Sequence, residues 1–234
     1  MDRRIYVPSG GLESWRSRLA DPESQWVRGK SAFETAVFWE YGARQPRGLH
    51  PKLASLLDQQ PELQNAELVA SFPEHRVRLP GGARASQNDV WAIVRVTAGL
   101  LSLAVEGKAG ESFAETIGEW RRDASDGKTK RLEYLCEQLG VRMPPDDGLR
   151  YQLLHRTVSA LLEAERIGAP VAAMIVVSFV KDQSSMADFS AFAACVGGSV
   201  IEGRLCRVKA SRPLFIGWLD LPRSTDAEVA QVAV

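Results

Sequence analysis

The chain has 234 residues, of which 45% are hydrophobic and 25% charged, as in an ordinary soluble globular protein. Its 29 basic and 29 acidic residues cancel, so no overall field draws it to nucleic acid or anionic lipid, although a local patch would suffice. Three cysteines are too few and too scattered for a disulfide framework or a zinc site. The chain starts without the apolar stretch of a signal peptide, and no apolar run reaches membrane-spanning length. We therefore expect a cytoplasmic protein with no membrane partner.

The first part of the chain has the signals of short helices. Ser31 and Glu34 form a capping-box pattern, and Pro51 and Pro61 suit the first turns of two further helices. We expect three parts: a helical N-terminal extension packed on the core over residues 1–70, an α/β core over 71–222, and a short C-terminal tail over 223–234.

A β-hairpin in the middle of the chain is the most informative segment. A first short strand is expected at Arg76 to Leu79, followed by two longer ones joined by a two-residue turn at Thr97-Ala98. Pairing 94 with 101, 92 with 103 and 90 with 105 places apolar residues opposite one another. A slip of one residue would set polar side chains against that row, so the hydrophobic pattern selects this register.

The register brings three charges to one end of the hairpin. Asp89 falls opposite Glu106, about 5 Å away at Cβ, and Lys108 lies on the same face. Two neighbouring carboxylates repel each other unless a cation neutralises them or one is protonated. Mg²⁺ typically takes one or two carboxylates and keeps water and phosphate oxygens as its other ligands. The alternative is an ordinary surface ion cluster in which Lys108 neutralises the acids.

Helices and buried strands alternate through the rest of the chain. Helices are expected from Gly110 to about Arg122 and from Lys128 to Gly140, followed by a long amphipathic helix near 148–168. The apolar run Val171 to Val180 reads as a buried central strand. A helical stretch at Met186 to Cys195 and strand-like runs at Ser199–Val208 and Leu214–Leu219 complete the pattern. These elements predict an α/β fold around a mixed sheet.

The spacing of Asp89, a hairpin and Glu106-x-Lys108 resembles the signature of the PD-(D/E)xK superfamily, the restriction-endonuclease-like phosphodiesterases. The resemblance covers roughly residues 70–180 and implies a mixed sheet with an αβββαβ core flanked by helices. It also implies that Asp89 and Glu106 bind Mg²⁺ or Mn²⁺ and that Lys108 assists catalysis. The proline that often precedes the first acid is replaced by Asn88. The whole chain also resembles a group of uncharacterised bacterial proteins with this core.

Three further residues are secondary candidates for the site. Some members of the superfamily have a glutamate before the meander, which Glu74 would match; a solvated loop residue is the alternative. Gln152, His155 and Ser159 form a polar stripe on the long helix that could hydrogen-bond a substrate or a metal-bound water. A partly exposed polar residue with no role is the alternative for a single histidine on a helix.

The leading hypothesis is a metal-dependent phosphodiesterase, and among these a nuclease acting on nucleic acid. The rival is a catalytically inactive protein that retains the nuclease fold and binds nucleic acid or protein. A third possibility is an accidental signature in a domain that binds a small molecule. The sequence does not distinguish DNA from RNA, and it leaves the oligomeric state open.

Overall fold

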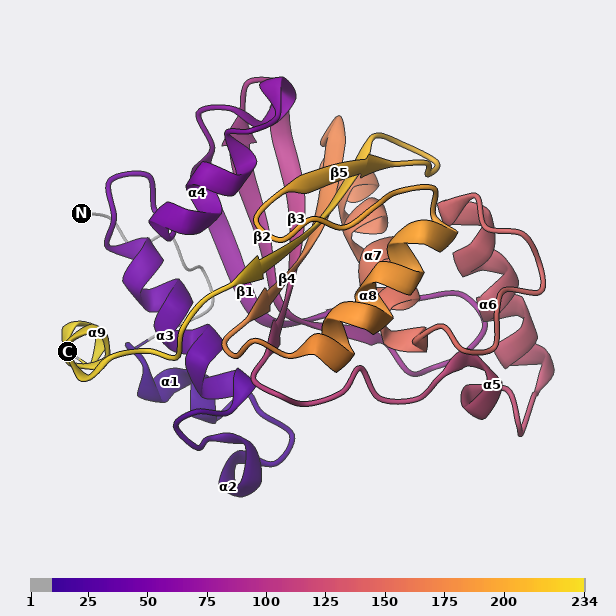
Figure 1. Ribbon diagram of the computed structural model, residues 1–234, viewed down its shortest axis with the longest axis horizontal. Helices are drawn as coiled ribbons and strands as arrows, with labels where there is room; N and C mark the ends of the chain where they lie inside the picture. Colours follow the sequence, from indigo (N-terminus) through magenta and orange to yellow (C-terminus); the bar gives the residue numbers. More distant parts are fainter. Residues whose placement is uncertain (1–9, 234) are drawn as a thin grey trace.

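A computed structural model describes residues 10–233, in which six strands form one mixed sheet (Figure 1). The strand order is β1-β2-β3-β4-β6-β5. β1, β2 and β3 form an antiparallel meander, β4 and β6 continue the sheet parallel to β3, and β5 closes it antiparallel to β6. The strands span Glu67–Val77 (β1), Ser86–Val96 (β2), Gly99–Lys108 (β3), Val171–Ser178 (β4), Leu205–Val208 (β5) and Leu214–Asp220 (β6).

Helices cover both faces of this sheet, so the chain folds into three layers (Figure 1). One apolar core lies between the sheet and α1, α3 and α4, and the other between the sheet and α6, α7 and α8. The helices are α1 (Glu13–Arg16), α2 (Pro22–Gln25), α3 (Ser31–Ala43), α4 (Pro51–Leu57), η1 (Pro61–Leu63, a 3₁₀ turn), α5 (Ile117–Trp120), α6 (Asp126–Leu139), α7 (Tyr151–Arg166), α8 (Gln183–Cys195) and α9 (Asp226–Val232). The α/β class with a mixed sheet is confirmed. None of the helices within residues 10–233 is both long and apolar enough to cross a bilayer.

The predicted register of the hairpin is confirmed for its three apolar pairs, but the ladder ends before the expected pair of Asp89 with Glu106. β2 and β3 pair Val90 with Val105, Ala92 with Leu103, and Val94 with Leu101. All six side chains are buried against α3 and α4, which explains why the apolar row fixes the register. The long amphipathic helix and the buried strand after it are also present, as α7 and β4. Every residue of β4 is buried, as expected of a central strand with parallel neighbours on both sides.

Several predicted boundaries were wrong. β1 begins at Glu67 instead of Arg76, so it starts before the expected boundary at residue 70 and Glu74 lies inside it. The expected helix from Gly110 to Arg122 is reduced to the single turn of α5. Only the end of the run 199–208 is a strand. The expected tail contains the helix α9, which begins at a capping box formed by Thr225 and Glu228.

The capping box expected at the start of α3 is absent. Lys30 is the N-cap and makes no side-chain cap bond. Glu34 instead accepts hydrogen bonds from the backbone N–H groups of Gly29 and Ser224, which joins the helix to the C-terminal segment. The start of α3 is satisfied by Glu111, whose carboxylate accepts from the backbone N–H and hydroxyl of Ser31.

Candidate functional site

The sheet opens between β2 and β3, and the predicted charges gather at this opening. The β2–β3 ladder ends at the pair Val90–Val105, although β2 continues to pair with β1 and β3 continues to pair with β4. Asp89 lies one residue beyond the last pair. Its Oδ2 accepts a hydrogen bond from the backbone N–H of Gly107 at 2.8 Å, which replaces a ladder bond with a side-chain bond. The carboxylate is thereby held at the fork between the two strands.

Three carboxylates form a row across neighbouring strands at this fork. The residues on either side of Glu74 pair with those on either side of Asp89, so these two lie opposite each other on β1 and β2. Glu106 follows on β3, one residue beyond the β2–β3 ladder. By these strand positions, the secondary candidate Glu74 joins the two principal acids. Glu74 also has a φ of 54°, which is uncommon for a non-glycine residue in a strand.

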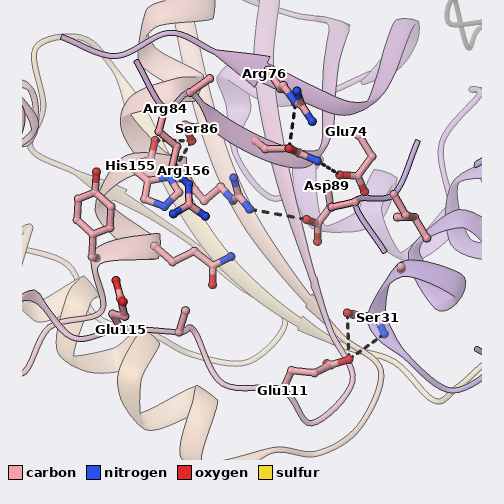
Figure 2. Close-up of a pocket in the computed structure, with 18 of the residues that line it drawn as sticks. Ser31, Glu74, Arg76, Arg84, Ser86, Asp89, Glu111, Glu115, His155 and Arg156 are labelled. Carbon is pink, nitrogen blue, oxygen red and sulfur yellow. Dashed lines mark hydrogen bonds and ion pairs between the residues drawn. The ribbon is translucent and has the colours of Figure 1, made fainter. Parts of the chain in front are cut away.

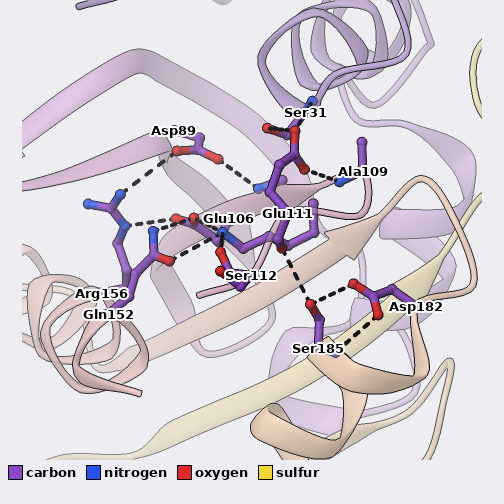
Figure 3. Close-up of polar contacts among 12 residues, drawn as sticks. Ser31, Asp89, Glu106, Ala109, Glu111, Ser112, Gln152, Arg156, Asp182 and Ser185 are labelled. Atoms are coloured by element: carbon purple, nitrogen blue, oxygen red, sulfur yellow. Dashed lines mark hydrogen bonds and ion pairs between the residues drawn. The ribbon is translucent and has the colours of Figure 1, made fainter. Parts of the chain in front are cut away.

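Glu106 is the most tightly held member of the row (Figure 3). Its Oε1 accepts from Lys108 Nζ at 3.0 Å and from Gln152 Nε2 at 2.6 Å. Its Oε2 accepts from Arg156 Nε at 2.7 Å. Only 4% of the Glu106 side chain is exposed, so this carboxylate is paired on both oxygens and closed to solvent.

Lys108 lies behind Glu106, away from bulk water. Its ammonium donates to Glu106, to Gln152 Oε1 at 3.2 Å and to the carbonyl of Ser112 at 3.4 Å. It also lies 4.7 Å from the centre of the Phe113 ring, and 7% of the side chain is exposed. The predicted proximity of Asp89, Glu106 and Lys108 is thus present, with the lysine fixed through Glu106.

The two principal acids differ in their electrostatics. Burial and the neighbouring charge of Glu106 raise the pKa of Asp89 well above its usual value, against the pull of Arg156. Burial also opposes the charge on Glu106, but Arg156 and Lys108 outweigh it and lower the pKa of that carboxyl. Burial raises the pKa of Glu74 as well. The cluster therefore favours an ionised Glu106 and resists a second and third negative charge.

A pocket of about 880 Å³ opens beside this row and is bordered by α2, the start of α3, the end of β1 and α7. Asp89 and Glu74 lie at one end of it, Arg84, Ser86 and His155 lie toward the other, and Arg156 reaches across toward Asp89 (Figure 2). Glu106 and Lys108 do not line it. Five basic residues do: Lys30, Arg76, Arg84, Arg131 and Arg156. Four acids line it as well, Glu74, Asp89, Glu111 and Glu115. An anionic ligand would meet positive charge mainly at the exposed Lys30, Arg76 and Arg84.

The candidates on α7 separate into two groups. Gln152 hydrogen-bonds to Glu106, and Arg156 joins it one helical turn later. His155 points elsewhere: its Nδ1 lies 2.7 Å from the hydroxyl of Ser86. Burial holds the pKa of His155 well below its usual value, so it is neutral near pH 7. Ser159 is buried and donates to the carbonyl of His155. The stripe of Gln152, His155 and Ser159 expected on this helix therefore does not meet the acids as a unit.

The carboxylate oxygens of Asp89 and Glu106 at the fork are of the type and charge that a divalent cation takes as ligands. Two carboxylates, with water and phosphate as the other ligands, are what Mg²⁺ commonly takes. Within residues 10–233 no group of three or more His, Cys, Asp or Glu side chains is arranged to hold a metal ion. Both oxygens of Glu106 are occupied by Lys108, Gln152 and Arg156, so an ion could reach Glu106 only if Arg156 moved.

Two residues at the site were not predicted. Arg156 contacts both acids, and its spacing from Gln152 was the available signal. Thr35 of α3 packs on Gly107 beneath Asp89, and its buried hydroxyl has no hydrogen-bond partner within the described part of the chain. No local pattern links Thr35 to the hairpin, because the contact spans more than seventy residues of sequence.

A comparison with protein families matches residues 8–223 to a family model described as "Domain of unknown function (DUF6946)". Neither a curated protein nor a solved structure matches the chain. The site must therefore be interpreted from its own chemistry.

Proposed function

Because the chain belongs to the DUF6946 family, whose function is unknown, we propose its activity from the site alone: a metal-dependent phosphodiesterase acting on nucleic acid. The observation that supports this best is the row of Glu74, Asp89 and Glu106 at the β2–β3 fork, with Lys108 behind it and, in front, a pocket that the exposed Arg76 and Arg84 border. Carboxylates and a lysine beside an anion-binding pocket suit phosphoryl chemistry.

The strand topology supports a restriction-endonuclease-like core. α3 precedes the antiparallel meander β1-β2-β3, and α7 then leads into β4 parallel to β3. This order matches the αβββαβ arrangement that the Asp89, Glu106-x-Lys108 spacing implies. Three free thiols, Cys136, Cys195 and Cys206, suit a reducing compartment, and we place the activity in the cytoplasm.

Each residue of the site has a distinct role in this proposal. Asp89 and Glu106 would hold Mg²⁺ or Mn²⁺, which when bound lowers the pKa of a water and polarises a phosphoryl oxygen. Gln152 orients Glu106 through its amide, and Lys108 holds Glu106 from behind through its ammonium. Arg76 and Arg84, both exposed on the pocket wall, would contact the flanking backbone phosphates.

A cleavage assay tests the proposal. Single- and double-stranded DNA and RNA are incubated with Mg²⁺ or Mn²⁺ and with wild type, Asp89→Asn, Lys108→Met and the exposed control Lys209→Met. We expect cleavage by wild type and the control, with losses of at least about a hundredfold in the two site variants. Circular dichroism of each variant separates loss of chemistry from loss of fold. Full activity in Lys108→Met would remove that residue from the mechanism.

A second candidate function is a nuclease-fold protein that binds nucleic acid without cutting it. The supporting observation is Arg156, which pairs with Glu106 directly and without any metal. Wild-type protein that binds DNA or RNA, loses binding in Arg76→Gln or Arg84→Gln, and cleaves with neither metal would favour this candidate.

A further inference from the structure

Arg156 occupies the position between the two principal acids. Its Nε lies 2.7 Å from Glu106 Oε2, and one of its terminal nitrogens lies 3.9 Å from Asp89 Oδ1 (Figure 3). The contact to Glu106 is a charge-assisted hydrogen bond, whereas the contact to Asp89 is too long to be one. Arg156 is thus bound firmly to one acid and loosely to the other.

The exposed fraction of the side chain increases from Glu106 through Arg156 to Asp89. The exposed fraction is 4% for Glu106, 11% for Arg156 and 24% for Asp89. Arg156 and Asp89 line the pocket, and Glu106 does not. The guanidinium therefore lies between the pocket and Glu106, and a ligand that approached Glu106 from the pocket would have to displace it.

Arg156 neutralises the two principal acids unequally. Glu106 has a charge-assisted hydrogen bond from Arg156 and an ion pair with Lys108, whereas Asp89 has, among the described residues, only the looser ion pair with Arg156 at 3.9 Å. Glu74 and Glu106 lie on the strands on either side of Asp89. Asp89 is therefore the less neutralised of the two, and a divalent cation beside it would relieve the repulsion among the three acids.

We propose that Arg156 is an exchangeable counter-ion. Without a divalent cation it neutralises Glu106 and, more weakly, Asp89. When the cation arrives, Arg156 releases Glu106 Oε2 and turns its guanidinium toward the pocket, where it faces the substrate phosphate. This inference rests on the proposed function, because it takes the fork between β2 and β3 as the cation site.

Metal binding by Arg156 variants tests this exchange without any assay of activity. Calorimetry with Mn²⁺ is run on wild type, Arg156→Gln, Arg156→Lys and the control Arg166→Gln, which lies on the same helix but pairs with Glu163. Removing a competing positive charge should tighten Mn²⁺ binding about tenfold or more in Arg156→Gln. Arg156→Lys should fall between this variant and wild type, and the control should equal wild type. If Arg156→Gln does not fold, the Mn²⁺ affinity of Arg156→Lys compared with that of wild type tests the exchange.

The wild-type protein provides a direct readout as well. The Nε–Hε signal of Arg156 in a ¹⁵N-correlated NMR spectrum, assigned by its absence in Arg156→Lys, should shift when diamagnetic Mg²⁺ saturates the site. Mg²⁺ binding that leaves this signal unchanged, or equal Mn²⁺ affinity in wild type and the Arg156 variants, would overturn the exchange but leave the metal site in place. Absence of Mn²⁺ binding in wild type and every Arg156 variant would contradict both this inference and the metal-dependent activity.

Discussion

The hydroxyl oxygen of Thr35 lies 1.9 Å from the point where a Cβ would stand on Gly107, so α3 packs directly on the backbone of β3. Real side chains do not approach so closely, and only glycine fits at this position. The contact lies beneath Asp89, whose Oδ2 accepts from the backbone N–H of Gly107. Gly107 therefore sets both the distance of α3 from the sheet and the position of the carboxylate.

Gly107→Ala should destabilise the protein by about 2–3 kcal/mol, because the core is already filled at this point. The double variant Thr35→Ala/Gly107→Ala should recover most of this loss, since it removes the clashing hydroxyl. Thr35→Val/Gly107→Ala is the matched control: valine keeps the bulk of threonine and should give no recovery. Urea unfolding measures all three. Equal stability of the two double variants would show that the clash is not the cause.

The parts of the fold predicted correctly are those in which neighbouring residues contain the information. The hairpin register followed from three apolar pairs, among them Val90 with Val105. These pairs fix the register because they are buried against α3 and α4, where a slip would bury polar side chains instead. β1 was predicted to begin at Arg76 but begins at Glu67 and contains Pro73. Proline within a sheet is mostly confined to edge strands, and β1 is one.

The parts predicted incorrectly depend on contacts between distant segments. Helical spacing places either His155 or Arg156 beside Gln152, and only the packing of α7 on the sheet decides which one meets the acids. Glu34 and Glu111 bond to groups far away in sequence, so the local capping pattern at Ser31 was misleading. The sequence thus indicated the row of acids and Lys108, but not that Arg156 would pair with Glu106 as well.

Asp89 and Glu106 should respond differently to loss of charge. Glu106→Gln leaves Lys108 and Arg156 as buried cations without their carboxylate, which should cost about 3–5 kcal/mol. Asp89→Asn should cost under about 1 kcal/mol, because burial and the neighbouring acid already disfavour this carboxylate and an amide oxygen can still accept from Gly107. Unfolding by urea in the presence of EDTA compares them. Equal losses in the two variants would contradict the assigned pKa directions.

His50 should make the stability of the fold depend on pH. Burial lowers its pKa to about 4 from the usual 6.5, and the ring stacks on Phe38 with centroids 4.6 Å apart. Between these pH values the unfolded chain binds a proton that the folded chain does not, so stability is full above pH 6.5 and falls as the pH drops toward 4. With allowance for the partial exposure of the ring, we expect a contribution of about 1–2 kcal/mol.

His50→Asn isolates this contribution. Asparagine is a good N-cap and can still accept from the backbone N–H of Lys52, as the Nδ1 of His50 does, but it does not titrate. The variant should be less stable than wild type at pH 7, because the stacking is lost, and the difference should shrink as the pH falls to 4. Urea unfolding across this range measures it. A difference that stays constant with pH would assign the acid sensitivity to other groups.

Arg131 holds the loop that joins β1 to β2. Its guanidinium donates to four backbone carbonyls, those of Leu79, Pro80, Gly82 and Arg84, and 7% of the residue is exposed. Lysine has one nitrogen and cannot reach all four oxygens, so Arg131→Lys should lose about 2–4 kcal/mol. The same loop presents Arg84 to the pocket, so its looseness should also weaken binding of a nucleic acid.

Hydrogen exchange measured by mass spectrometry separates the local effect from the global one. Arg131→Lys should speed exchange in residues 79–85 well beyond the change in β4, whose amides report on global unfolding. Arg122→Lys, an exposed change after α5, is the matched control and should leave both segments unchanged. Exchange that rises equally in the loop and in β4 would mean that Arg131 stabilises the whole fold and does not order this wall of the pocket in particular.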